Sequence, residues 1–551
     1  MQMLKLLRDF FDFTLDDRSI RLGRFMFACV LVVDLVRRWQ FSEFFFSDTG
    51  VLTHDAWMNV WGKKPYYWSI HWGPDWYMNL LFGTQIGLAV SMGLGLFPRI
   101  SAFLGWFLLG SLVLRNPLMV YGGDKLSTLL LLAFAFVPTG SERTKSPRLA
   151  QFGGFLYISQ LVITYCAAGA AKMGPNSWQR GDALLNAFHM NLLVKPLGVW
   201  LSEWPALLYL PSVATPWFEL LWPWLLLLPA GLLKGGMRTV TIVALLGLNM
   251  GIFVTLDVGF FMLYTSPALL VLLPSQIWEV EPLRKLGATV LNQIRSHECR
   301  LVPRSLVEKS SLLGVVFLGA IYWVTAFEGM KVYDIDWPWS AWNVIRTPNL
   351  YQNWGLFTNP NRKLQWYVAK AELKSGETVD ILQNGASINF ARPRHPNPVF
   401  WDNYRWRLAF AKSNKHFKEA SMRNRLAWAI GKHWDNHQPD ERHVKSVKLY
   451  RMTKNLNFEK DEKRFWKIFG EYPLPPPGQA KQENESDVSS SELGVPEKSK
   501  SKASRKIDRL KKVGLQPPDI ENNSKDDVKG DSEGQIVESS IEPKLEAEPQ
   551  N

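Results

Sequence analysis

Cysteine is scarce in this chain of 551 residues, which contains only three. Cys29 and Cys166 lie inside apolar runs, and no two cysteines are spaced as CxxC. A disulfide framework is therefore excluded, and cysteine-based zinc or thioredoxin-type redox chemistry is not expected. The sequence also lacks a Walker loop, a GxGxxG pattern and a GxSxG nucleophile elbow. The common nucleotide-binding and hydrolase motifs therefore point to no function here.

Charged residues make up only 21% of the chain, whereas apolar residues make up 47%. The mean hydropathy of −0.08 hides a sharp partition between polar segments and long apolar runs. Nine such runs are present: 25–36, 78–98, 100–114, 126–137, 152–173, 212–233, 239–256, 258–273 and 311–326. They are typical of membrane-spanning helices, and the 25 tryptophans suit the interface between membrane and water. We predict a polytopic α-helical membrane domain with about nine transmembrane helices over residues 1–330.

Lys and Arg are unevenly distributed between the connecting segments. Alternating nine spans from an inside N-terminus places most basic clusters inside, including those at 143–148 and 284–309, and leaves the outside segments richer in Trp, Gly and Pro. The positive-inside rule therefore favours an inside N-terminus and an outside C-terminus. No small-x-small cleavage site follows the first run, so we expect a retained span. Segment 184–210 is apolar but interrupted by Lys and Pro, which predicts interfacial or re-entrant helices on the outer side.

The polar part of the chain divides at about residue 474. Residues 331–474 predict an extracytoplasmic α+β domain, with a β-hairpin at 366–382, helices at 402–414 and 417–434, and a strand at 444–452. Residues 475–551 contain no aromatic residue and are rich in Ser, Glu, Lys and Pro. Such a composition cannot bury enough apolar surface to fold, so we predict a disordered C-terminal tail.

The net charge of +13 is concentrated in one segment. Residues 391–469 carry 19 Lys and Arg against 8 Asp and Glu, whereas residues 476–551 carry 12 against 16. A basic segment of this kind suits the head groups of a lipid bilayer or an acidic polypeptide. No nucleic-acid-binding motif accompanies the charge, so we expect no nucleic acid partner. The oligomeric state is left open.

Lys172 stands at the end of a long apolar run, directly after the small residues 167–171. A lysine desolvated there would lose its proton more easily and is a candidate catalytic base. The alternative is a lysine that snorkels to the interface. Glu219 lies early in another run, and is either a second catalytic candidate or a structural partner of Lys172 or Arg180.

Other polar residues have simpler interpretations. Asp34 is expected to pair with Arg37 or Arg38 along one helix, and Asp257 to serve a turn. The histidines lack the spacing and fourth ligand of a closed zinc site, so we predict no metal. This set comprises His54 and His71, with the nearby Asp55, in the first outer loop, and His433, His437 and His443 in KHWDNHQPDERH.

Several segments, in order and spacing, resemble the HTTM membrane domain, the family that includes vitamin K-dependent gamma-carboxylase. They are RLGRFMFACVLVVDLVRRW (21–39), RNPLMVYGGDKLSTLLLLAFAFVP (115–138), YCAAGAAKMGPNSWQRGDAL (165–184), ATPWFELLWPWLLLLP (214–229), LDVGFFMLYTSPALLVLLP (256–274) and YQNWGLFTNP (351–360). The resemblance covers about residues 15–455. The carboxylase has an A-G-x-K-K motif, whose second lysine is kept here as Lys172 while Ala171 replaces the first.

The resemblance implies a gamma-carboxylase-like enzyme that uses a reduced quinone, with O2 and CO2 as co-substrates, to modify glutamate of an extracytoplasmic substrate. Lys172 would be its base. The alternative is a non-catalytic membrane protein that binds lipid or partner proteins. Either function predicts a multi-pass protein, and we favour a bacterial plasma membrane over the endoplasmic reticulum.

Overall fold

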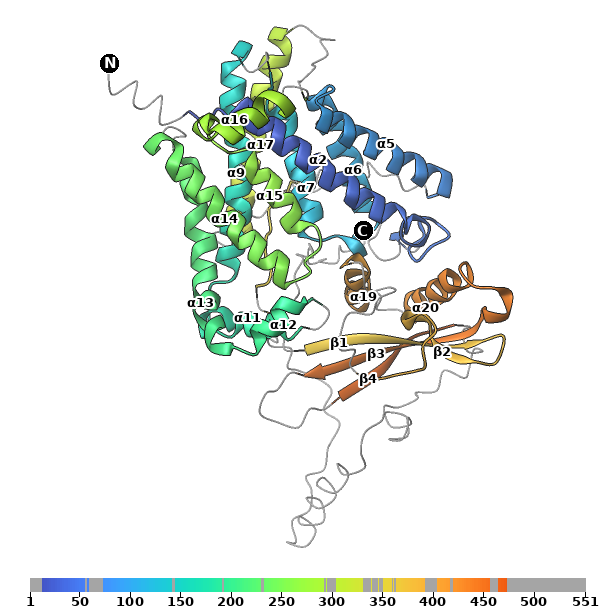
Figure 1. Cartoon of the computed structure of the whole chain (residues 1–551). Coiled ribbons are helices and arrows are strands. Elements are labelled where there is room, and N and C mark those ends of the chain that lie inside the picture. Colours follow the sequence, from blue (N-terminus) through green and yellow to red (C-terminus); the bar gives the residue numbers. More distant parts are fainter. Residues whose placement is uncertain are drawn as a thin grey trace, which may run out of the picture. The chain divides into compact units, whose positions relative to one another are not determined.

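The computed structural model describes most of the chain up to residue 472 (Figure 1). The described residues are 12–54, 57–58, 73–140, 144–190, 193–228, 232–291, 294, 304–330, 338, 345, 350–358, 360, 363–391, 404–416, 420–455 and 464–472. They form a mostly helical protein with one small antiparallel sheet. The predicted disordered tail lies outside the described residues.

Contacts divide the chain into two compact units. The helical unit comprises described residues up to 361 together with those of 400–422. The sheet unit comprises described residues of 362–399 and from 423 onward. Residues 400–422, which composition assigns to the outer domain, therefore group with the helical unit.

The helical unit is built mainly from long apolar helices. They are α2 (Asp17–Trp39), α5 (Asp75–Leu94), α6 (Pro98–Arg115), α7 (Gly122–Phe136), α9 (Pro147–Ala171), α13 (Pro205–Leu221), α14 (Gly236–Thr255), α15 (Phe261–Leu270) and α17 (Arg304–Gly329). Shorter helices are α3 (Ser42–Phe45), α10 (Ser177–Arg180), α11 (Ala183–Phe188), α12 (Pro196–Ser202), α16 (Glu281–Leu286) and α19 (Tyr404–His416). Each of the nine predicted apolar runs falls at least partly on one of these helices.

Three described helices are long and apolar enough to cross a membrane. They are Pro147–Ala171, Gly236–Thr255 and the Ser311–Gly329 part of α17, with mean hydropathies of 1.4, 1.7 and 1.7. These helices support membrane association, while the number of nine spans stays a prediction. In α9, 83% of the apolar window is buried, against 28% in α14 and 33% in α17. The helix that leads to Lys172 is therefore a central helix of its unit.

Hydrogen bonds join the helix ends in two sets. In one set, Ser19 at the start of α2 donates to the Leu273 carbonyl at 2.8 Å, and Arg99 at the start of α6 donates to the Ala135 carbonyl at 2.9 Å. Arg99 also reaches Ser311 of α17 at 3.3 Å. A chain that crosses the membrane back and forth through the predicted spans would bring these helix ends to the predicted inner side.

The second set joins the opposite ends. Lys195 N–H donates to the Thr255 carbonyl at 2.8 Å, and Asp257 N–H donates to the Leu193 carbonyl at 2.6 Å. The Phe260 N–H donates to the Tyr121 hydroxyl at 2.8 Å. The alternating path places all of these residues on the predicted outer side, although the orientation in a membrane stays a prediction.

The interrupted segment 184–210 forms short helices, as its Lys and Pro residues suggest. Helices α11 and α12 precede α13, and Pro211 and Pro216 lie inside α13. Proline removes a helical hydrogen bond and bends the backbone. Trp200 and Trp204 leave more than half of their surface exposed. This exposure suits an interfacial position, which stays a prediction.

The sheet unit contains four antiparallel strands in the order β2-β1-β3-β4. The strands are β1 (Lys363–Leu373), β2 (Thr378–Asp380), β3 (Val444–Asn455) and β4 (Arg464–Tyr472). The predicted hairpin is confirmed, because Lys370, Ala371 and Glu372 of β1 pair with residues 378–380. The helices predicted at 402–414 and 417–434 and the strand predicted at 444–452 correspond to α19, α20 (Ala420–Asp435) and β3.

Helix α20 packs against the sheet through its apolar side and two polar anchors. The side chain of Asn424 accepts the Glu471 N–H at 2.9 Å, and that of Asp435 accepts the Val444 N–H at 2.8 Å. A buried cluster of Trp366, Val368, Tyr450 and Met452 lies on strands β1 and β3. This cluster lies on the face of the sheet opposite α20, where Ile388 and Phe390 pack against it, so the sheet is covered on both faces.

Candidate functional site

Lys172 is the residue that ends helix α9. The small residues before it allow α13 to approach closely: a Cβ at Gly169 would lie only 2.6 Å from the Leu220 nitrogen and 2.8 Å from the Pro216 oxygen. Small residues at such crossings let helix backbones come together in membranes. This contact brings the end of α9 beside Glu219 of α13.

Lys172 and Glu219 form a buried ion pair. The Lys172 Nζ lies 2.6 Å from Glu219 Oε2, and the residues are 3% and 6% exposed. The ammonium also donates to the Ala168 carbonyl at 3.1 Å and lies 5.6 Å from the centroid of the Trp178 ring. The lysine therefore points into the protein instead of snorkelling out to solvent. Of the two predicted partners of Glu219, Lys172 is the one found, while Arg180 lies 3.7 Å from Asp182.

The loop after α9 holds this pair in place. The Asn176 side chain donates to the Lys172 carbonyl at 2.9 Å and accepts the Trp178 N–H at 2.9 Å, capping α10. Trp178 Nε1 then donates to the Phe357 carbonyl at 2.8 Å. Two of the segments that carry the family resemblance, YCAAGAAKMGPNSWQRGDAL and YQNWGLFTNP, are thus in direct contact across almost 180 residues.

The same segment reaches the middle of α9. Gln352 donates to the Gln160 side-chain oxygen at 2.7 Å and accepts the Trp354 Nε1–H at 2.6 Å. All three residues are buried. Buried amides with paired donors and acceptors fix a single side-chain arrangement. The chain around residues 350–358 therefore locks α9, which carries Lys172 at its end.

The pair has the chemistry of a proton-exchange site. At 2.6 Å, a proton can pass between an amine and a carboxylate without any movement of either side chain. Only the Oε2 atom of Glu219 takes part in the contact with Lys172. The same pair also contributes to the stability of the bundle, because a buried charge that loses its partner is strongly destabilising.

The structure contains a second polar cluster, of which the sequence predicts only one pair. Asp34 pairs with Arg38, as its helical spacing suggests, and both also contact residues from far along the chain. Arg405 Nη2 lies 2.9 Å from Asp34 and 2.8 Å from Asp124, and Arg38 lies 2.5 Å from Asp124. Tyr264 donates to Asp34 at 2.8 Å. We call Asp34, Arg38, Asp124 and Arg405 the charge square.

The charge square is balanced, with two carboxylates and two guanidinium groups, each residue at most 5% exposed. It joins α2, the start of α7 and α19. The local pairing of Asp34 with Arg38 has a sequence signal, but nothing in the sequence links either residue to Arg405. The one hint is Asp124, an acid at the start of an apolar run, since such acids have a partner or a function.

The remaining candidates have structural contacts. Asp257 accepts the Gly259 N–H at 3.3 Å, as expected of a turn residue, and also pairs with Arg407. Among the described residues, no group of three His, Cys, Asp or Glu is placed to hold a metal ion. The His433 and His437 rings are 4.6 Å apart, while His443 pairs with Asp440. Of the first outer loop, Asp55 and His71 lie outside the described residues.

No family model matches the chain, and no curated protein or solved structure matches it either.

Proposed function

We propose that this chain is a membrane protein of the HTTM type that modifies glutamate side chains of an extracytoplasmic substrate in a quinone-linked reaction. The observation that carries this proposal is the buried pair of Lys172 and Glu219, on the motif that resembles the carboxylase. Lys172 is the base, and Glu219 receives or returns its proton. The three helices of spanning length support the membrane location.

The pair suits a reduced quinone. Glu219 Oε1 can accept a hydrogen bond from a quinol hydroxyl, and Lys172 can exchange a proton with the carboxylate at 2.6 Å. A reduced quinone, when bound, supplies electrons to O2. Burial at 3% and 6% exposure keeps water away from both groups. A dry site strengthens the electrostatic control of proton position, because water no longer screens the charges.

Carboxylation is the specific reaction that the resemblance names. The γ-C–H bond of a substrate glutamate breaks, its proton passes to the strong base that a reduced quinone would supply on reaction with O2, and its electron pair forms the new C–C bond to CO2. The role of this chain is to hold a proton at Lys172 or Glu219 at the right moment. At position 172 this role requires a side chain that can lose its proton, which arginine cannot do, because guanidinium stays protonated.

The test is substrate-dependent quinol oxidation by the purified protein in detergent. Lys172→Arg keeps the cation opposite Glu219 but removes the base, and Lys172→Ala removes both. Lys285→Ala, which removes a lysine side chain that is 74% exposed, is the matched control. We expect both Lys172 variants to lose turnover by at least 100-fold, the range of general base catalysis, with the control unchanged.

Folding yield and melting temperature are measured on every variant. A well-folded Lys172→Arg protein with full turnover would refute the base and favour a structural pair. Absence of turnover in the wild type with ubiquinol, menaquinol and vitamin K hydroquinone would favour the second candidate, a non-catalytic membrane protein that binds lipid or partner proteins. One observation favours that candidate: the Lys172 ammonium is already satisfied by Glu219, Ala168 and the Trp178 ring.

A further inference from the structure

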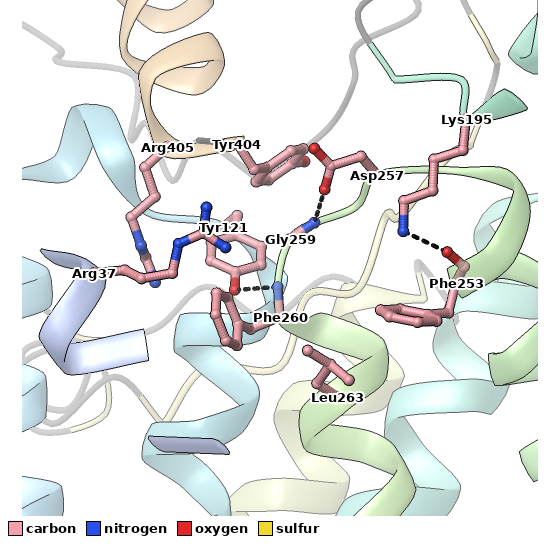
Figure 2. Close-up of a pocket in the computed structure, with 10 residues that line it drawn as sticks. All are labelled: Arg37, Tyr121, Lys195, Phe253, Asp257, Gly259, Phe260, Leu263, Tyr404 and Arg405. Atoms are coloured by element: carbon pink, nitrogen blue, oxygen red, sulfur yellow. Dashed lines mark hydrogen bonds between the residues drawn. The ribbon is translucent and has the colours of Figure 1, made fainter. Parts of the chain in front are cut away.

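A cavity of about 270 Å³ lies among helix ends of the helical unit (Figure 2), and neither Lys172 nor Glu219 belongs to its lining. Its lining includes three cations, Arg37 of α2, Lys195 before α12 and Arg405 of α19. The carboxylate in the lining, Asp257, is already paired with Arg407. The walls are therefore positive, which favours an anionic ligand.

The cations are held in place before any ligand binds. Lys195 Nζ donates to the Phe253 carbonyl at 2.6 Å and lies 4.1 Å from the centroid of the Phe253 ring. The Arg37 guanidinium lies 5.8 Å from the Phe260 ring centroid. Figure 2 shows Arg37 and Arg405 near the Tyr121 ring, with Lys195 at the other end of the cavity. Fixed donors bind an anion without an ordering cost.

Lys195 has an electrostatic reason to accept an anion. Burial and the nearby Arg407 lower the pKa of Lys195 below its usual value. Arg405, in contrast, already shares its charge with Asp34 and Asp124 in the charge square. An anion beside Lys195 would offset both the desolvation and the repulsion. Lys195 is therefore the cation on which the binding of a ligand depends most.

An exposed apolar face leads away from the cavity. Along α14, Val240, Val243, Met250 and Val254 are 57%, 60%, 59% and 36% exposed. Their spacing of three, seven and four residues places them on one face of the helix. Val254 is the neighbour of Phe253, which lines the cavity. A ligand with an anionic head and an apolar tail matches this arrangement.

We propose that the cavity binds the head group of an anionic phospholipid, with its phosphate at Lys195, the rest of the head group reaching toward Arg37, and an acyl chain along the exposed face of α14. A pocket with positive walls attracts an anionic head group. The proposal depends on the membrane location of α14, and it is independent of the proton transfer proposed for Lys172. Failure of one therefore leaves the other standing.

The test is native mass spectrometry of the delipidated full chain in a neutral detergent, titrated with phosphatidylglycerol or phosphatidylcholine. We expect one saturable phosphatidylglycerol site and weaker binding of phosphatidylcholine, whose head group has no net charge. Lys195→Gln should weaken phosphatidylglycerol binding about tenfold or more, as expected for loss of a hydrogen bond to a charged group. Arg180→Gln is the matched control, since Arg180 lies outside the lining, at a neighbouring helix end, and is 55% exposed.

Arg37→Gln gives a second variant, at the end of α2, if Lys195→Gln folds poorly. Equal affinity of wild type and both folded variants for phosphatidylglycerol would overturn the proposal, as would equal affinity for the two lipids. Saturable binding of inorganic phosphate that depends on Lys195 would keep the phosphate site but assign it to a soluble ligand. Lys195-dependent binding of a Glu-rich peptide without any phosphatidylglycerol binding would overturn the lipid and assign the cavity to acidic chains.

Discussion

Asp380 of the sheet unit is a buried acid whose replacement should make the fold more stable at neutral pH. It ends strand β2 and is 0% exposed. Its Oδ1 accepts the N–H of Ala369 at 3.1 Å and that of Leu382 at 3.0 Å, whereas Oδ2 has no hydrogen bond from the described part of the chain. Burial raises the pKa of Asp380 to about 7, and the backbone hydrogen bonds offset only part of this rise.

The sign of the pH dependence follows from this raised pKa. In the unfolded chain the carboxyl ionises near pH 4, and in the folded chain near pH 7. Between these values unfolding releases a proton, so the free energy of unfolding falls as the pH rises. A difference of about three pKa units corresponds to about 4 kcal/mol, lost between about pH 4 and pH 7 and constant above pH 7.

The variant Asp380→Asn keeps the oxygen that accepts both N–H groups and removes the charge. Its free energy of unfolding should therefore lack this loss. Relative to the wild type, the variant should gain about 1.4 kcal/mol per pH unit between pH 5 and pH 7, with no further gain above pH 7. Glu377→Gln, in the same hairpin with a side chain that is 55% exposed, should show no such gain.

Hydrogen exchange with mass spectrometry, on peptides from residues 363–383 of the full-length protein, measures this difference. Intrinsic exchange depends on pH equally in both proteins, so the ratio of protection factors isolates the effect of Asp380. The ratio should rise about 100-fold from pH 5 to pH 7 and then level off. A ratio that stays constant with pH would refute the raised pKa and the burial argument behind it.

Three further predictions concern the helical unit and are measured by thermal unfolding in detergent. Glu219→Leu alone should lower the free energy of unfolding by about 3–5 kcal/mol, because it leaves Lys172 buried without its partner. The double variant with Lys172→Met should recover most of this loss. A double variant no more stable than Glu219→Leu would contradict the prediction. Arg405→Lys should lower the free energy of unfolding by about 3 kcal/mol, because an ammonium cannot bridge two carboxylates as a guanidinium does. A variant as stable as the wild type would argue against the charge square. Gly169→Ala should destabilise the protein by about 1–3 kcal/mol, because the added methyl group clashes with α13. Gly251→Ala is the control: an added Cβ there has nothing within 4 Å, so this variant should be neutral or slightly more stable. Equal effects of the two variants would rule out the close crossing of α9 and α13.

The sequence was informative wherever the structural signal is local. The alternation of WYVAKAEL and the turn KSGE predict the hairpin, because strand pairing across four residues needs no distant information. The long apolar runs predict helices for the same reason. Residue type alone suggests Lys172 as one of two partners of Glu219, since an intramembrane acid needs a partner.

Strand β4 shows why other parts escape prediction. Its segment RFWKIFGEY does not alternate cleanly, and its register against β3 shifts between Leu449 and Tyr450. Gly470 is required by a distant contact, because a Cβ there would lie 2.3 Å from the Arg423 carbonyl of α20. A glycine in a strand that serves packing from another element has no signal in its own neighbourhood.

The charge square also has a consequence for how the protein is made. Arg405 follows Asp124 by 281 residues and Asp34 by 371. At 5–20 residues per second, synthesis takes roughly 15 to 55 s to pass from Asp124 to Arg405. During that time Arg38 faces two carboxylates, which leaves one negative charge in excess at a site that is buried in the finished protein. The charges of the early helices are therefore balanced only once α19 has been made, so a late part of the chain completes a buried site at its beginning.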